Sequence, residues 1–461
     1  MQESTKTALF ESAPVPAALA RMALPTVVSQ LITLVYNIAD TWFIGRTNNP
    51  YMVAASSLVL TVFLMSAALS NLFGVGGGSL VVRLLGQKRE DEARSAASLS
   101  LTMAAGAALL YALFTLALMN PLLRLLGASD NTIGFARQYL LCVVVIGALP
   151  TVLSIVAASL LRSVGYAREA AFGLGMGGVL NITLDPLFMF VLLPDGFQVL
   201  GAGLATMLSN LASFCYFFAV LRRVERESVL SIPRRVERIE PPSMRSLFSV
   251  GVPAGLSLFL FDLTNIVINR LSASHGDIEL AAMGIVLKVE RLPLNIGIGI
   301  CLGMVPLVGF NYAARNHKRM NEFFSAARTV GLAVAAVCVV LYRVFAPQLI
   351  RAFIEDADTV RFGTQFLQAR CFAPPFMFLS FHIVHFMQAV DRGKVSFYLA
   401  VIRQLCLNIP ILFLFNALFG MTGIVWTQMT ADILNTIVSY VIYFRVLRKI
   451  TEETNEGRLE P

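Results

Sequence analysis

Charged residues are scarce in this chain. They make up 14% of its 461 residues, against about 25% in an ordinary soluble domain. Hydrophobic residues make up 57%, and the mean hydropathy is +0.72. A soluble protein of this length cannot bury so much apolar surface in its core. The composition argues against a secreted enzyme, a nucleic-acid-binding protein and a disordered scaffold, and it favours an integral membrane protein.

Familiar motifs of catalytic and metal sites are missing. His382 and His385 lack the Glu that would make a zinc motif, and the glycine run Gly74–Ser79 lacks the Gly-Lys-Ser/Thr of a phosphate-binding loop. We expect packing or cavity polarity from the histidines, and close helix packing or a hinge from the glycines. We expect no enzyme activity, no cofactor and no metal site. The cysteines form no Cys-x-x-Cys pair, and all lie in apolar stretches where disulfides are not expected: Cys142, Cys215, Cys301, Cys338, Cys371 and Cys406.

Long apolar stretches dominate the chain. Each is long enough to cross about 30 Å of hydrocarbon as a helix, and lipid offers the backbone no other hydrogen-bond partner. The polar residues 1–16 do not resemble a cleavable signal. We therefore predict an all-α membrane protein with twelve transmembrane helices at residues 17–44, 52–80, 95–119, 133–158, 169–193, 200–221, 247–271, 280–309, 324–346, 363–388, 395–418 and 421–445.

Basic residues predict the orientation of these helices. The connections after the even-numbered helices, counted with the adjoining helix ends, carry 19 Lys and Arg, and the opposite connections counted in the same way carry 7. Basic residues collect in cytoplasmic loops, so the net charge of +8 is a topology signal and does not indicate nucleic-acid binding. We expect a multi-pass protein of a bacterial or archaeal plasma membrane, with both termini cytoplasmic.

The longest polar stretch, 222–246, divides the chain into two halves. It contains Pro233 and alternates Arg with Glu, as a cytoplasmic linker would. We expect six-helix lobes at residues 17–221 and 247–447. Short cytoplasmic tails, residues 1–16 and 448–461, complete the predicted organisation.

The two halves resemble each other when one is laid over the other at a nearly constant offset. Each predicted lobe holds an even number of helices, so both insert with the same orientation. Such a parallel repeat is typical of transporters whose halves move around a central cavity. The matching positions include Leu24-Pro25 with Val252-Pro253, Arg124 with Arg351, Gln138-Tyr139-Leu140 with Gln365-Phe366-Leu367, and Asn181 with Asn408.

Carboxylates inside the apolar stretches are candidates for a functional site. An acid at the bilayer centre costs about 2.5–3.5 kcal/mol, so it needs a proton, an ion, a partner or water. Asn181 and Asp185 share a helix face, and Pro186 frees a backbone carbonyl one turn earlier. Together with Asp40, they form an oxygen-rich set that suits Na⁺ or a proton. The alternative is that each acid caps a helix end or faces a wet vestibule.

The second half has its own intramembrane charges. Asp262 lies in the seventh predicted helix, and Lys288, Glu290 and Arg291 lie in the eighth. They could line a substrate cavity or form internal ion pairs, and the sequence leaves both open. A structural or interfacial role is expected for three others: Arg370, Arg403 and Asp432.

These patterns resemble the multidrug and toxic compound extrusion (MATE) family of cation-coupled antiporters. The resemblance rests on Asn37–Asp40, Gly74–Ser79, Asn181–Pro186 and Pro306–Tyr312, and it extends over residues 17–447. It implies twelve helices in two pseudo-symmetric six-helix lobes around a central cavity. It also implies export of bulky, often cationic compounds in exchange for H⁺ or Na⁺.

The resemblance also assigns candidate residues. In the branch that this chain resembles most, the cation binds in the first lobe, at positions that correspond here to Asp40, Asn181, Asp185 and Thr206. Tyr36 and Asn37 are candidates for the cavity or the substrate site. Another branch also uses acids of the seventh and tenth helices, but the tenth predicted helix here has no acid between Phe372 and Gln388.

We therefore expect multidrug efflux by secondary antiport. The expected partners are small-molecule drugs or dyes and the lipid bilayer, with no nucleic acid, and the chain is expected to be a monomer. One alternative is a flippase for lipid-linked cell-envelope precursors, which would need a strongly basic cavity. Another is an intramembrane metalloenzyme, which would need more ligands than His382 and His385 provide.

Overall fold

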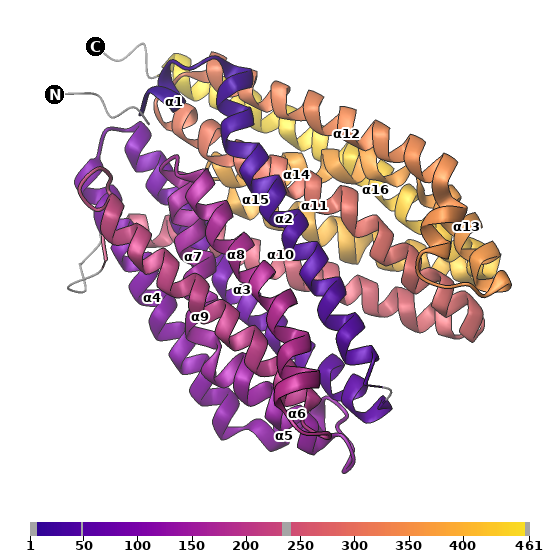
Figure 1. Cartoon of the computed structure of the whole chain (residues 1–461). Coiled ribbons are helices and arrows are strands. Elements are labelled where there is room, and N and C mark those ends of the chain that lie inside the picture. The colour runs from indigo at the N-terminus through magenta and orange to yellow at the C-terminus, as the bar shows by residue number, and fades with distance from the viewer. Residues whose placement is uncertain (1–6, 48, 233–240, 457–461) are drawn as a thin grey trace. The chain divides into compact units, whose positions relative to one another are not determined.

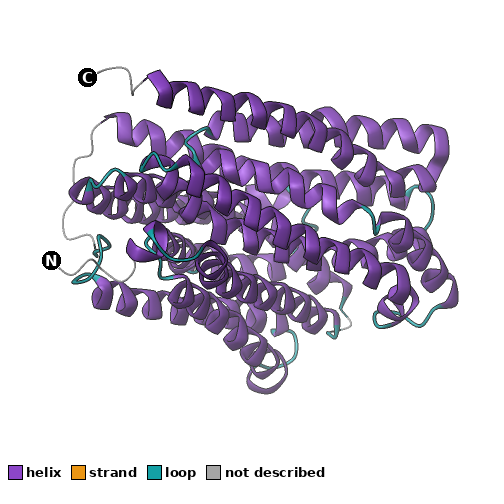
Figure 2. Cartoon of the chain, turned by 90° about the horizontal axis from the view of Figure 1, so that it is seen from above, coloured by secondary structure: helices purple, strands orange, loops and turns teal. Residues whose placement is uncertain are grey.

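The computed structural model describes residues 7–47, 49–232 and 241–456, and all regular elements in these ranges are helices (Figure 2). Parts of the predicted tails and linker, including Pro233, Arg234, Arg235, Arg238 and Arg458, lie outside the described residues. The chain forms two compact units, Met1–Gly255 and Leu256–Pro461. The boundary between the units falls inside one helix, α10. The predicted linker and lobe limits stay a prediction.

The first unit is a bundle of helices that runs from indigo to magenta in Figure 1. Its elements are α1 (Thr7–Glu11), α2 (Val15–Gly45), α3 (Pro50–Gly86), α4 (Glu90–Ala117), α5 (Met119–Leu125), α6 (Ile133–Leu140), the π-helix η1 (Leu141–Ile146), α7 (Ala148–Ser163), α8 (Ala167–Leu187), the π-helix η2 (Phe188–Leu192), α9 (Gln198–Val224) and the start of α10 (Pro241–Ala273).

The second unit, coloured orange to yellow for most of its length, contains the rest of α10 and the remaining helices. These are α11 (Asp277–Ala313), α12 (His317–Arg351), α13 (Ala357–Arg370), α14 (Ala373–Ala389), α15 (Gly393–Val401), the π-helix η3 (Ile402–Asn408) and α16 (Ile409–Glu456).

The helices account for the twelve predicted spans. In the described ranges, nine helices are each long and apolar enough to cross a membrane. One of them, Gly393–Glu452, breaks at Gly420, whose φ of 59° is left-handed, so it supplies two spans. The bent pair Ile133–Ile146 and Ala148–Ser163 supplies another, and α13 followed by α14 covers the stretch 363–388. The prediction of an all-α membrane protein with twelve spans is confirmed.

The glycine run of α3 serves close packing, as predicted. A side chain at Gly74 would meet Ser159 of α7 at 3.0 Å, and one at Gly76 would meet the Leu247 carbonyl of α10 at 2.5 Å. Arg83, at the end of the same helix, is 5% exposed and donates to Ser79 at 2.5 Å and to Ser246 at 2.6 Å. These contacts join the start of α10 to the first unit.

The repeat is visible in how corresponding helices end. Lys88 lies in the connection after α3 and Arg315 lies in the connection after α11, and both adopt left-handed backbone with φ of 60° and 56°. The next residue in each case donates its N–H to the carbonyl five residues back, at 2.9 Å from Arg89 and 2.8 Å from Asn316. The offset between Lys88 and Arg315 equals the one that relates Asn181 to Asn408 in the sequence.

Two further packing predictions also hold. His382 is fully buried and stacks between Phe324 and Phe378, with ring centroids 4.1 and 5.5 Å away. This environment is apolar and aromatic, in keeping with a packing role. The six cysteines all lie in the described ranges, and each of them is free.

Candidate functional site

Close approach of α2 and α8 places Asp40 near Asp185. A side chain at Gly178 of α8 would come within 2.8 Å of Ile32 and 3.1 Å of Tyr36, so only glycine lets α2 lie this near. Asp40 follows Tyr36 by about one helical turn, and Asp185 follows Gly178 by about two. The two carboxylates interact electrostatically as a result.

The contact between α8 and α9 adds an amide and a hydroxyl. Ser213 of α9 donates its hydroxyl to the Gly173 carbonyl of α8 at 3.0 Å. Further along the same pair of helices, the Asn181 amide donates to the Thr206 hydroxyl at 3.2 Å. The structure thus brings together the four residues expected to hold a cation, Asp40, Asn181, Asp185 and Thr206.

The site contains buried oxygen atoms that no donor satisfies. Asp185 is fully buried, and neither of its carboxylate oxygens has a hydrogen-bond partner within the described part of the chain. The same is true of one Asp40 oxygen and of the Asn181 side-chain oxygen. A buried ionised acid without a donor is strongly unfavourable, and a second acid nearby adds repulsion. This arrangement favours uptake of a positive ion.

Tyr139 of α6 belongs to the same site, although its sequence position alone does not indicate this. Its side chain is 8% exposed, lies close to Thr206 and interacts electrostatically with Asp40 and Asp185. Gly203 allows this contact, because a side chain there would meet the Tyr139 ring at 3.2 Å. The sequence repeat could have indicated this residue. The position that matches Tyr139 is Phe366, so the hydroxyl is present in one half only.

The helix that carries Asp185 does not break at Pro186. It remains α-helical through Leu187 and then continues as the π-helix η2. Pro186 has no N–H, so the Ile182 carbonyl still lacks its usual helical donor. A side chain at Gly201 of α9 would meet the Phe188 backbone of η2 at 2.9 Å, which shows how tightly α9 holds this end of the helix.

The two cavity candidates on α2, Tyr36 and Asn37, differ in their surroundings. Tyr36 is half-buried and interacts electrostatically with Asp40, so it lies at the edge of the acidic site. Asn37 is exposed, and its amide donates to the Thr33 carbonyl of its own helix at 2.8 Å. The structure therefore places Tyr36 at the acidic site, whereas the Asn37 side chain bonds only to the backbone of its own helix in the described chain.

The charges of α11 separate into two kinds. Glu290 accepts two hydrogen bonds of 2.8 Å from Arg370 of α13, which is 2% exposed. The sequence left open whether Glu290 lines a cavity or forms an internal ion pair, and the structure shows the ion pair. Lys288 and Arg291 are exposed on the same helix. The Asp262 side chain lies outside the described residues.

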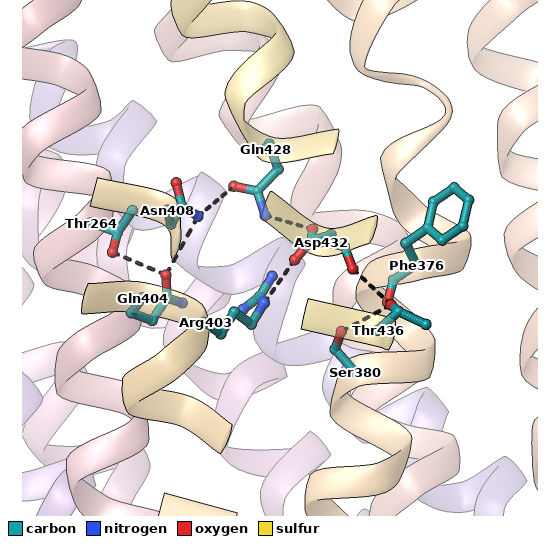
Figure 3. Close-up of polar contacts among 9 residues, drawn as sticks. All are labelled: Thr264, Phe376, Ser380, Arg403, Gln404, Asn408, Gln428, Asp432 and Thr436. Atoms are coloured by element: carbon teal, nitrogen blue, oxygen red, sulfur yellow. Dashed lines mark hydrogen bonds and ion pairs between the residues drawn. The ribbon is translucent and has the colours of Figure 1, made fainter. Parts of the chain in front are cut away.

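A second polar network lies inside the second unit (Figure 3). Arg403 of η3 donates to Asp432 of α16 at 2.8 Å, and both side chains are buried. The Gln428 amide donates to the other Asp432 oxygen at 2.7 Å. The network continues through Asn408 and Gln404 to Thr264 of α10. The buried ion pair of Arg403 and Asp432 is in keeping with the structural or interfacial role expected for them.

Comparison with known proteins agrees with this architecture. The MatE family model matches residues 25–187 and 253–414, one segment in each half, related by nearly the offset of the sequence repeat. The multidrug export protein MepA of Staphylococcus aureus strain MSSA476 is 29% identical over 450 residues, covering 97% of each chain. The MepA protein of Staphylococcus saprophyticus is 29% identical over 449 residues, again covering 97% of each.

Solved structures show the same fold. An outward-facing multidrug resistance MATE family transporter of the MOP superfamily has a TM-score of 0.92 at 22% identity, covering 98% of this chain and all of that one. A MOP superfamily transporter from Pyrococcus furiosus, described as having a binding pocket of reversed polarity, has a TM-score of 0.85 at 23% identity, covering 96% and 98%. Both likenesses extend over the whole two-lobe fold. With the family match covering most of both halves, the chain belongs to the MatE family and is a multi-pass membrane transporter.

Proposed function

We propose that this protein exports lipophilic, often cationic compounds in exchange for H⁺ or Na⁺. The single observation that carries the proposal is the pair Asp40 and Asp185: both oxygens of the fully buried Asp185 and one oxygen of Asp40 lack donors in the described chain. The names of the curated relatives, which are multidrug export proteins, support efflux of small molecules.

The composition of the site supports exchange of a cation. Two carboxylates, an amide oxygen and two hydroxyls are hard oxygen ligands, which suit Na⁺, and either acid can instead take a proton. The site therefore alternates between a cation-loaded and an unloaded state. The two acids interact electrostatically, so we expect them to bind one cation as a unit. In exchange, cation entry from outside would accompany drug release, and cation exit inside would precede drug rebinding.

An ion gradient is large enough to drive such export. A membrane potential of 100 mV is worth about 2.3 kcal/mol per charge. Since about 1.4 kcal/mol corresponds to a tenfold ratio, one charge supports roughly a 50-fold substrate gradient. The negative charge of the acids favours cationic substrates over anionic ones of similar size.

The flippase alternative receives less support from the charges. A flippase for lipid-linked precursors needs basic groups that can face a pyrophosphate. Arg370 and Arg403 are buried, and each is already bonded to an acid, Glu290 and Asp432. Their positive charges are thus neutralised within the second unit.

We further propose that both termini are cytoplasmic and that the transporter works as a monomer. The basic residues of even-numbered connections support the orientation. A cysteine introduced at Arg226, which follows α9, should react with a membrane-impermeant thiol reagent only after cell lysis. Reaction in intact cells would reverse the orientation.

Transport into proteoliposomes of defined orientation tests the function. Ethidium movement should follow an imposed Na⁺ or pH gradient, and an ionophore for that ion should abolish it. An anionic dye of similar size should move much less. Ethidium transport that ignores both gradients would contradict antiport, whereas transport of lipid-linked precursors alone would favour the flippase.

A further inference from the structure

The fifth helix of each lobe carries an equivalent asparagine. Asn181 and Asn408 occupy matching positions of the repeat, and they are 3% and 1% exposed. Each amide donates at 3.2 Å to an oxygen of the sixth helix of its lobe, on Thr206 in one and Gln428 in the other. The oxygen of each asparagine has no donor among the residues described. The two lobes thus keep one common element of the site.

The surroundings of the two asparagines differ in charge. The offset that relates the asparagines places Leu412 at the position of Asp185, and Phe366 at that of Tyr139. Leu412 is fully buried and Phe366 is 6% exposed. The second lobe therefore lacks, at the matching positions, the carboxylate and hydroxyl that make the first site able to take a cation.

One acid of the second lobe is linked to Asn408 through Gln428, and this acid is already paired. Asp432 is fully buried, and both of its oxygens accept hydrogen bonds, from Arg403 and from Gln428 (Figure 3). Arg403 is 5% exposed, and its guanidinium lies 4.8 Å from the Phe381 ring and 5.9 Å from the Phe261 ring. This counter-charge is therefore held in place by packing on two aromatic rings as well as by the acid.

We propose that Arg403 acts as a built-in cation that removes Asp432 from ion coupling, and so keeps this acid from adding an ion to those that the first lobe exchanges per cycle. The inference rests on the proposed antiport at Asp40 and Asp185. A guanidinium keeps its proton under physiological conditions and cannot leave its chain, so it neutralises Asp432 without exchanging. Arg403 is thus a residue that sets stoichiometry.

Removing this charge should create a second exchangeable cation site. In Arg403→Gln, Asp432 remains buried without a counter-charge, so it must take up a proton or Na⁺. Arg403→Lys keeps a positive charge and is the matched control. The double variant Arg403→Gln with Asp432→Asn replaces the ion pair by two neutral amides, and it controls for loss of the pair itself.

The test counts cations on the purified full-length protein in nanodiscs. Infrared spectroscopy detects a protonated buried carboxyl, and radioactive sodium measures bound Na⁺. Arg403→Gln should gain one cation per chain relative to wild type, by one readout or the other, and the double variant and Arg403→Lys should not. An unchanged total in folded Arg403→Gln would overturn the proposal.

A second measurement covers the case in which Arg403→Gln does not fold. The ion-to-drug ratio follows from the ion gradient that just balances an opposing drug gradient in proteoliposomes. The double variant should show the wild-type ratio, and a lower ratio would mean that Asp432 exchanges ions in the wild type. Failure of the antiport itself is distinct: then wild-type drug flux would not respond to any ion gradient.

Discussion

Replacing Glu290 with alanine should leave Arg370 buried without its counter-charge. The guanidinium is 2% exposed, and its two short bonds, both 2.8 Å, go to Glu290. Its remaining contact that the structure shows is a long one, 3.5 Å to the Val425 carbonyl. Removing one partner of a buried pair costs about 3–5 kcal/mol, so we expect a loss of that size in the free energy of unfolding.

A surface pair provides the matched comparison. Arg89 and Glu92 form an ion pair of similar length, 2.6 Å, but their side chains are 46% and 41% exposed. Exposed pairs contribute about 0.2–1 kcal/mol, so Glu92→Ala should cost no more than that. The double variant Glu290→Met with Arg370→Met removes both charges of the pair, of which Glu290 is 14% exposed, and should be close to wild type in stability.

The free energy of unfolding of each variant is measured by titration with SDS in mixed micelles, with the helical circular dichroism signal as the readout. The expected order is Glu290→Ala far below Glu92→Ala, with the double variant restored. A Glu290→Ala protein as stable as the Glu92→Ala protein would refute the argument that buried Arg370 needs Glu290 as its counter-charge.

Three further predictions concern packing, the site and a helix end. Gly251→Ala should destabilise the protein strongly, because the new side chain would collide with the Leu72 carbonyl. In Gly106→Ala the new side chain meets nothing within 4 Å, so this variant should stabilise the protein by up to about 1 kcal/mol. Unfolding by SDS compares the two variants. Tyr139→Phe removes a hydroxyl from the acidic site, so radioactive Na⁺ binding or proton release on drug addition should weaken several-fold while expression stays normal. Hydrogen bonds from Thr359 lower the pKa of Asp356, the N-cap of α13. Its stabilising effect should be full at neutral pH and be lost as the pH falls through that lowered pKa, so Asp356→Ala and wild type should converge in stability in acid.

The fold followed from the sequence because its signals are long and repeated. An apolar stretch of spanning length has one main solution in lipid, a helix, and the twelve stretches needed no knowledge of tertiary contacts. The boundaries inside the helices were harder. The break at Gly420 and the π-helix after Pro186 depend on backbone conformation, which hydropathy does not report.

The candidate site was predictable only in part. Asp40, Asn181 and Asp185 were conspicuous because polar groups are costly in an apolar stretch. Tyr139 was not, since a tyrosine in an apolar stretch is common, and its role depends on Gly203 letting its ring approach α9. Whether Glu290 lines a cavity or pairs with Arg370 could not be decided either, because the two residues are far apart in sequence.

The measurement that tests the central claim most directly is gradient-driven ethidium export by Asp185→Asn, normalised to the amount of protein in the membrane. Asparagine keeps the shape of Asp185 but removes the charge that binds the cation. The matched control is Asp195→Asn, an exposed acid beyond the end of the same helix. We predict that export collapses in Asp185→Asn, that ethidium still binds, and that adding Asp40→Asn makes little further difference because the two acids act as one site. Export at the wild-type rate from Asp185→Asn would contradict the assignment of the coupling site.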